Sequence, residues 1–124
     1  MKYFIVFSVF ILFSCYEVER NCTNFQTGNY QSTITIDGIE YKSTFFRTSD
    51  LQVENFNGVI DSTKVRWIND CEMVFKTINP KNRAEQKDIH LKILTTTKNS
   101  YKFEYGYVGD TNKQKGEAKR VNLE

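Results

Sequence analysis

The sequence predicts an all-β domain, an antiparallel meander of about seven or eight strands that closes into a barrel or folds into a sandwich. Its composition favours strands, because aromatic residues make up 15% of the chain and Thr, Ile and Val recur. Short segments alternate apolar and polar side chains, as half-buried strands do. Asp37-Gly38 and Asn57-Gly58 separate such segments, and both dipeptides are strong hairpin signals. No long window repeats apolar residues at helical spacing.

The individual strands follow from these alternations, taken in chain order. Tyr30, Ser32 and Ile34 share one face of the first strand, and later segments alternate in the same way. Residues 59–61 form either a further strand or a loop. A closed barrel is favoured because an open meander leaves unpaired edge strands. The expected strands are residues 30–36, 39–47, 51–56, 64–68, 71–78, 89–93, 101–107 and 118–123.

Two polar segments separate expected strands, and the first of them is expected to be a solvated loop. Residues 79–88 contain the only proline and several charged side chains, with room for one helical turn. Residues 109–116 are polar and begin and end with glycine. Both segments therefore interrupt the meander.

The first fifteen residues predict export. Lys2 supplies a positive n-region, and residues 3–13 form an apolar h-region interrupted only by Ser8, which is typical of a signal peptide. The apolar stretch is shorter than the ~20 residues that a membrane-spanning helix needs. An uncleaved membrane helix is the alternative interpretation.

Leu12-Phe13-Ser14-Cys15 resembles the bacterial lipobox, with Phe13 as its one departure. The resemblance implies cleavage after residue 14 and a diacylglycerol on the sulfur of Cys15, and two or more acyl chains anchor a protein stably. Tyr16 follows, in place of the Asp that retains many such proteins at the inner membrane. We therefore expect an outer-membrane anchor, on its periplasmic or its surface face. The predicted organisation is a signal peptide over residues 1–14, a lipidated tether over 15–24 and a single β domain over 25–124.

Composition argues against several classes of function. Loss of Lys2 with the leader leaves 16 basic against 15 acidic residues, interspersed along the chain, so no basic patch for nucleic acid is expected. The sequence contains no P-loop, no Gly-x-Ser-x-Gly and no His-Glu-x-x-His. His90 is expected to be a surface residue on the polar face of its strand. We therefore predict no enzymatic activity, no cofactor and no metal site.

Two cysteines remain after Cys15 is set aside. A pair of cysteines in an exported domain predicts a disulfide between Cys22 and Cys71. The bond would close a loop of about fifty residues, worth roughly 4 kcal/mol in the chain-entropy model. The alternative is two buried free thiols that pack as small apolar side chains.

Gly28-Asn29-Tyr30, at the start of the first strand, is similar to the Gly-x-Trp signature of lipocalins, with Tyr in place of Trp. The resemblance implies a lipocalin-like barrel in which a basic residue of the last strand packs across this ring and closes the base. Arg120 or Lys119 stands where such a residue would be. The alternative is that Gly28 is a turn residue and Tyr30 an ordinary core aromatic.

A second resemblance extends over most of the mature chain. Phe25-x-x-Gly28, with a cysteine just before it, and Trp67-x-x-Asp70-Cys71 are similar to segments of a group of small Bacteroidota lipoproteins. This resemblance implies a compartment, and it implies no chemistry.

One row of aromatic residues suggests a function. Tyr101, Phe103, Tyr105 and Tyr107 share one face of a predicted strand, and with Trp67 the first three are candidates to line an apolar cavity. The alternative is a packed core, because a barrel of ~8 strands is just wide enough for side chains to fill it. We therefore expect a non-enzymatic, lipid-anchored envelope protein that binds an apolar small molecule. The alternative is a structural or interaction lipoprotein with a filled core, which acts through its outer surface.

Overall fold

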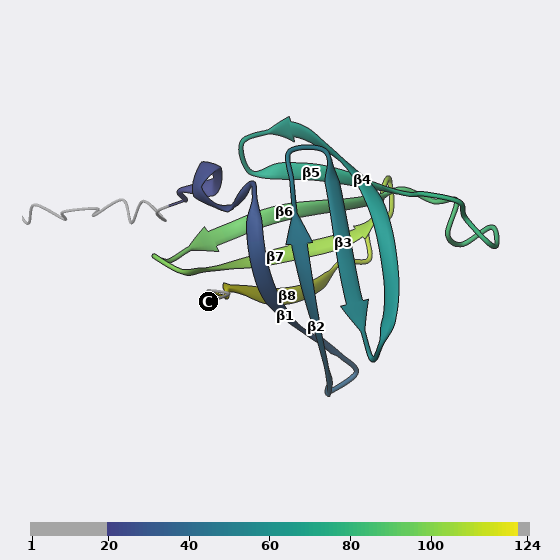
Figure 1. Cartoon of the computed structure of the whole chain (residues 1–124), viewed down its shortest axis with the longest axis horizontal. Helices are drawn as coiled ribbons and strands as arrows, with labels where there is room; N and C mark the ends of the chain where they lie inside the picture. The colour runs from purple at the N-terminus through teal and green to yellow at the C-terminus, as the bar shows by residue number, and fades with distance from the viewer. Residues whose placement is uncertain (1–19, 122–124) are drawn as a thin grey trace, which may run out of the picture.

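Eight antiparallel strands follow one another around a closed barrel, each paired with its neighbours in the sequence (Figure 1). The computed structural model describes residues 20–121, so the predicted signal peptide, Cys15 and the first part of the tether lie outside the described residues. A short 3-10 helix, η1 (Cys22–Phe25), precedes the barrel. The strands are β1 Gly28–Ile36, β2 Ile39–Arg47, β3 Leu51–Phe56, β4 Val59–Asn69, β5 Glu72–Thr77, β6 Ile89–Thr96, β7 Ser100–Tyr107 and β8 Gln114–Arg120. The predicted all-β meander is confirmed, and it closes as a barrel.

The two hairpin turns adopt the backbone conformation that their residues predict. Asp37 and Gly38 have φ angles of 51° and 79°, and Asn57 and Gly58 have φ angles of 50° and 83°. Two consecutive positive φ angles match the twist of the flanking strands. The side chain of Asn55 also accepts a hydrogen bond from the Gly58 amide at 3.0 Å.

β4 is longer than the sequence predicted. The uncertain segment 59–61 and the expected strand 64–68 join into one strand, Val59–Asn69. The residues between the two segments, Ser62 and Thr63, are polar. They belong to the strand because Ser62 pairs with β3 and Thr63 pairs with both β3 and β5.

β8 begins at Gln114, and the prediction of a start at residue 118 was wrong. The last three residues of the polar segment, 114–116, belong to the strand because they pair with β7. Gly116 faces the barrel interior, where an added Cβ would lie 2.6 Å from the ring of Phe103. Glycine here makes room for that ring.

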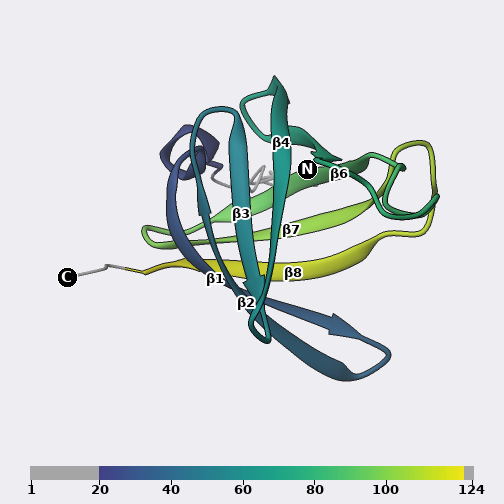
Figure 2. The same cartoon turned by 45° about the vertical axis from the view of Figure 1, so that its right-hand side comes forward.

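The barrel has two unlike ends, because alternate turns of a meander lie at the same end. We call the base the end with η1 and the β2–β3, β4–β5 and β6–β7 turns. The mouth is the end with the β1–β2, β3–β4 and β7–β8 turns and the long β5–β6 connection, which projects from the barrel (Figure 2). The described chain enters at the base, where the Asn21 amide donates to Thr96 Oγ1 at 2.8 Å.

A disulfide joins η1 to the β4–β5 turn. The sulfur atoms of Cys22 and Cys71 are 2.01 Å apart across a sequence separation of 49 residues, which confirms the predicted pairing. Cys22 and Phe25 are both buried and belong to the hydrophobic core. The bond thus fastens the N-terminal segment across the base.

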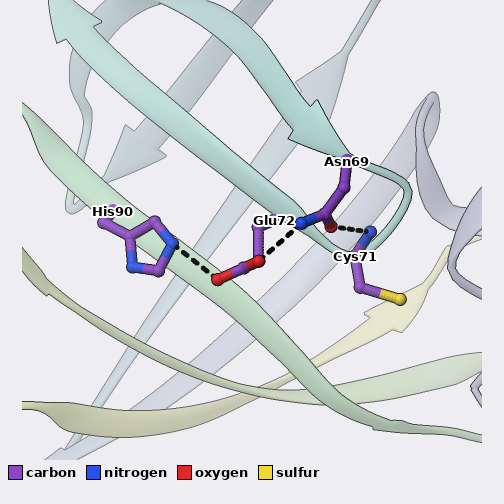
Figure 3. Close-up of polar contacts among 4 residues, drawn as sticks. All are labelled: Asn69, Cys71, Glu72 and His90. Carbon is purple, nitrogen blue, oxygen red and sulfur yellow. Dashed lines mark hydrogen bonds and ion pairs between the residues drawn. The ribbon is translucent and has the colours of Figure 1, made fainter.

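A chain of polar contacts shapes the turn that carries Cys71 (Figure 3). The Asn69 side chain accepts a hydrogen bond from the Cys71 amide at 2.9 Å and donates to Glu72 at 2.6 Å. The other carboxylate oxygen of Glu72 lies 3.1 Å from Nε2 of the partly exposed His90. The hydrogen bond from Asn69, together with the nearby charge of His90, holds the pKa of Glu72 below its ordinary value, against the opposing effect of burial.

Candidate ligand-binding cavity in the barrel

The base half of the interior is filled, and a buried arginine lies at its centre. Arg47 is 2% exposed, and its partners are neutral oxygen and sulfur atoms. Each of its nitrogens donates at least one hydrogen bond. Nε donates to Gln26 O at 3.2 Å, Nη1 to Gln52 Oε1 at 3.0 Å and Met73 Sδ at 3.5 Å, and Nη2 to Phe25 O at 2.6 Å and Tyr101 Oη at 3.1 Å.

Aromatic rings surround the same guanidinium group. Its central carbon lies 5.3–5.8 Å from the ring centroids of Tyr30, Phe45, Trp67 and Tyr101. Ring faces attract a cation, so they and the five hydrogen bonds together offset the cost of removing the charge from water. Sequence reasoning missed Arg47. The available signal was its place on the same strand face as Phe45, two residues earlier.

A second arginine closes the base from outside. The Arg120 guanidinium lies 5.0 Å from the ring of Phe25 and 5.9 Å from that of Tyr30, and it donates to the carbonyl of Asn24. Tyr30 donates in turn to Thr27 O at 2.6 Å. Of the two basic residues considered, Arg120 packs across the Tyr30 ring.

The mouth half of the interior contains a cavity of about 380 Å³, partly open to solvent. This is at the lower end of the volume range of small-molecule sites. Its deeper wall is apolar and includes Phe45, Phe75, Leu91 and Phe103. Ser32, Thr63 and Thr77 add hydroxyl groups to the lining. The interior is therefore filled at one end and hollow at the other.

Three of the four aromatic candidates line this cavity. Tyr101, Phe103 and Tyr105 stand in a row along β7, and successive ring centroids are 5.7 Å and 5.9 Å apart. Trp67 is placed elsewhere, in the base beside Arg47. Its Nε1 is buried and has no hydrogen-bond partner among the described residues.

Carboxylates line the cavity near its mouth, and sequence reasoning did not single them out. Glu54 of β3 and Asp61 of β4 are direct cross-strand partners, and Glu85 reaches the cavity from the β5–β6 connection. Burial raises the pKa of Glu54, the Ser43 hydroxyl lowers it, and the charge of Asp61 raises it further. Within the part of the chain that the structure describes, no Lys, Arg or His lines the cavity.

The fold and the cavity define a small up-and-down β-barrel with an interior site. Comparison of the chain with protein-family models, curated proteins and solved structures found no match. Within residues 20–121, no helix has the length and apolar character needed to cross a bilayer. In the same range, no three or more His, Cys, Asp or Glu side chains group closely enough to hold a metal ion.

Proposed function

We propose that this protein is a non-enzymatic, lipid-anchored envelope protein that binds a small molecule with an apolar body in the mouth half of its barrel. The observation that carries the proposal is the cavity of about 380 Å³ between the filled base and the mouth. A space of that size equals the volume of about a dozen water molecules at ~30 Å³ each. Its aromatic and aliphatic walls favour an apolar occupant over water.

The filled-core alternative describes only the base. There, Phe25, Tyr30, Met73 and Ile93 are at most 1% exposed, and they leave no room for a ligand. At the mouth, the Thr63 and Thr77 side chains line a hollow. The difference supports a binding function for the mouth and a structural one for the base.

The expected anchor supports access to the cavity from the aqueous side. The described chain enters at the base, beside the β6 residue Thr96. Residues 15–19 would separate this point from the lipid and can span at most ~18 Å. The base would then face the membrane and the mouth would face away from it. A ligand would arrive as a solute.

Binding is tested with 1-naphthalenemethanol, a neutral aromatic alcohol, on the mature lipoprotein reconstituted in phosphatidylcholine nanodiscs. We expect saturable binding of one molecule per protein, above the signal of empty nanodiscs. Thr63→Trp places an indole in the cavity and should weaken binding at least tenfold, whereas Ser62→Trp, on the outer face of the same strand, should not.

Saturable binding that Thr63→Trp leaves unchanged would contradict the site, and no saturable binding by the wild type would contradict the function. Thr77→Phe is a second variant that blocks the cavity in case Thr63→Trp does not fold. Retention of the Cys22–Cys71 disulfide and of the β-sheet circular dichroism spectrum checks the folding of each variant.

The anchor is tested separately in cells. Globomycin, which blocks the lipoprotein signal peptidase, should cause an unprocessed precursor to accumulate. Cys15→Ser should abolish labelling by radioactive palmitate, with Cys22→Ser as the control that retains it. A labelled Cys15→Ser protein would disprove lipidation at this residue.

An interaction surface on the outer wall is the second candidate function. Phe46 and Ile60 are 44% and 65% exposed, and with Val53 they line a shallow apolar groove. Exposed apolar side chains that gather in this way mark contact sites on other proteins. Phe46→Ser with Ile60→Ser should abolish recovery of a crosslinked envelope partner and leave naphthalenemethanol binding unchanged.

A further inference from the structure

We propose that the natural ligand of the cavity is an organic cation, an amine whose protonated nitrogen pairs with Glu54 and Asp61 and whose apolar body packs on the aromatic wall. The inference rests on the proposed function, because it takes for granted that the cavity holds a ligand. It adds the charge of that ligand and the direction in which it lies.

The first argument is the arrangement of the two carboxylates. Glu54 and Asp61 are opposite each other in the β3–β4 ladder and face the interior. Like charges in direct cross-strand partners destabilise a sheet. Among the described residues, the one side-chain ion pair joins Glu72 and His90 on the outer face, so no basic side chain neutralises this pair. A bound cation would.

The second argument is the gradient of polarity along the barrel axis. Glu54 and Asp61 stand one interior position below the Asn57-Gly58 turn at the mouth, and Asp61 is exposed. Deeper in the barrel, the wall consists of Phe75, Phe103 and other apolar side chains. A ligand with a charged head and an apolar body satisfies both regions in one orientation, with the head toward the mouth.

The third argument concerns the opposite charge. A fatty acid or another organic anion would need a basic partner, and the one buried basic side chain among the described residues is that of Arg47. Its five hydrogen bonds already occupy its nitrogens. The carboxylate of Glu54 also acts across the cavity, since its charge adds to the effect of burial in raising the pKa of Tyr105. The site therefore repels anions.

The fourth argument separates an organic cation from a metal ion. Metal sites in proteins draw several hard oxygen ligands close together, and the described residues contain no such group of three. The third carboxylate, that of Glu85, accepts the Lys81 amide of its own loop at 2.6 Å. Aromatic ring faces, such as that of Tyr105, add attraction for an alkylammonium group.

The test compares three compounds that share a naphthalene ring and differ in charge: 1-naphthylmethylamine, 1-naphthalenemethanol and 1-naphthoate. Binding is measured at pH 7 and low ionic strength by calorimetry, on the lipoprotein in phosphatidylcholine nanodiscs. We expect the amine to bind at least about tenfold more tightly than the alcohol, because charged hydrogen bonds are stronger than neutral ones. The naphthoate should bind most weakly.

Substitution of the carboxylates isolates the role of charge. Glu54→Gln with Asp61→Asn should lower the affinity for the amine about tenfold more than it lowers the affinity for the alcohol, so that the two compounds bind about equally well. Glu40→Gln is the control, because it removes the same charge from the exposed outer face of β2. Asp61→Asn alone should give part of the effect if the double variant does not fold.

The outcomes distinguish this inference from the function on which it rests. Equal affinities for the amine and the alcohol, or tightest binding of the naphthoate, would overturn the cation proposal and leave the cavity function standing. Equal weakening of amine and alcohol in the double variant would also overturn it. Absence of saturable binding by all three compounds would overturn the function itself.

Discussion

The base and the mouth of this barrel differ in whether their interior charges have partners within the chain. In the base, Arg47 is 2% exposed and donates five hydrogen bonds to neutral groups. At the mouth, Glu54 and Asp61 are opposite each other, and none of the described residues that line the cavity is basic. A buried charge needs partners. The base supplies them from within the chain, and we infer that the mouth takes its partner from solution.

The base and the mouth are also expected to differ in what they contribute, the base to stability and the mouth to ligand binding. The base is held by the Cys22–Cys71 disulfide, by the packing of η1 and by the rings around Arg47. The mouth has two long hairpins and a hollow interior. Regions with fewer buried contacts open at lower free energy. We therefore expect substitutions in the base to change folding and substitutions at the mouth to change ligand affinity.

The strongest test of this division is Arg47→Met. The substitution leaves the buried carbonyl of Phe25 and the partly buried carbonyl of Gln26 without their donors, and it removes a cation from the centre of four rings. We expect a loss of about 3–5 kcal/mol in the free energy of unfolding, measured by urea denaturation. Arg66→Met, on the exposed outer face of β4, should cost less than about 1 kcal/mol. Equal losses would remove the special role of the base.

The disulfide is the next largest contribution. Cys22→Ser with Cys71→Ser should lower the free energy of unfolding by roughly 2–4 kcal/mol. Dithiothreitol should destabilise the wild type by a similar amount and leave the stability of the double variant unchanged. The double variant therefore controls for effects of the reductant other than cleavage of this bond. A wild type insensitive to reduction would show that the bond does not stabilise the base.

At the mouth, the affinity for the amine should depend on pH. Burial raises the pKa of Glu54, whereas an alkylamine stays protonated as lysine does. As the pH falls through the raised pKa, Glu54 becomes neutral, and the affinity for 1-naphthylmethylamine should fall by about tenfold. Calorimetry across this range measures the effect. The alcohol is the control, and an amine affinity that does not depend on pH would contradict the role of Glu54.

Glu54→Gln should stabilise the ligand-free protein at pH 7. A carboxyl whose pKa is raised on folding binds its proton more tightly in the folded state, so stability falls as pH rises from the ordinary value of 4.5 through the raised pKa. The variant should therefore unfold at a higher temperature than the wild type at pH 7, and the difference should shrink as the pH approaches 4. A lower unfolding midpoint for the variant at pH 7 would contradict a net destabilising effect of burying the Glu54 carboxylate.

Glu72 in the base should show the opposite sign with a smaller effect. Its pKa is lowered, chiefly by the hydrogen bond from Asn69, so its contribution to stability is present above the ordinary value of 4.5 and is lost as the pH falls through the lowered pKa. Glu72→Gln should destabilise at pH 7 by less than about 0.5 kcal/mol, since the group is near the surface. Thermal unfolding at pH 7 and at pH 3 measures the change. A variant more stable than the wild type at pH 7 would contradict this assignment.

The candidate site could be predicted only in part. The row Tyr101, Phe103 and Tyr105 was visible as an alternation along one strand, and all three line the cavity. Trp67 was grouped with them because it too is an inward-facing aromatic, but depth along the barrel separates it from them. No local pattern indicated that Glu54 and Asp61 face the interior. A carboxylate in a short strand is expected to face solvent unless the two neighbouring strands of the barrel are known.

The order of the strands, the positions of the tight turns and the pairing of the cysteines were determined by the sequence itself. These depend on local properties: the alternation of side chains every two residues, the tolerance of Asp-Gly and Asn-Gly for positive φ angles and the small number of cysteines. Tertiary structure alone decided that β8 joins β1, that Arg47 is satisfied in the base, and that Glu54 meets Asp61 beside a hollow. Those features depend on register and closure, which bring together side chains that no local pattern relates.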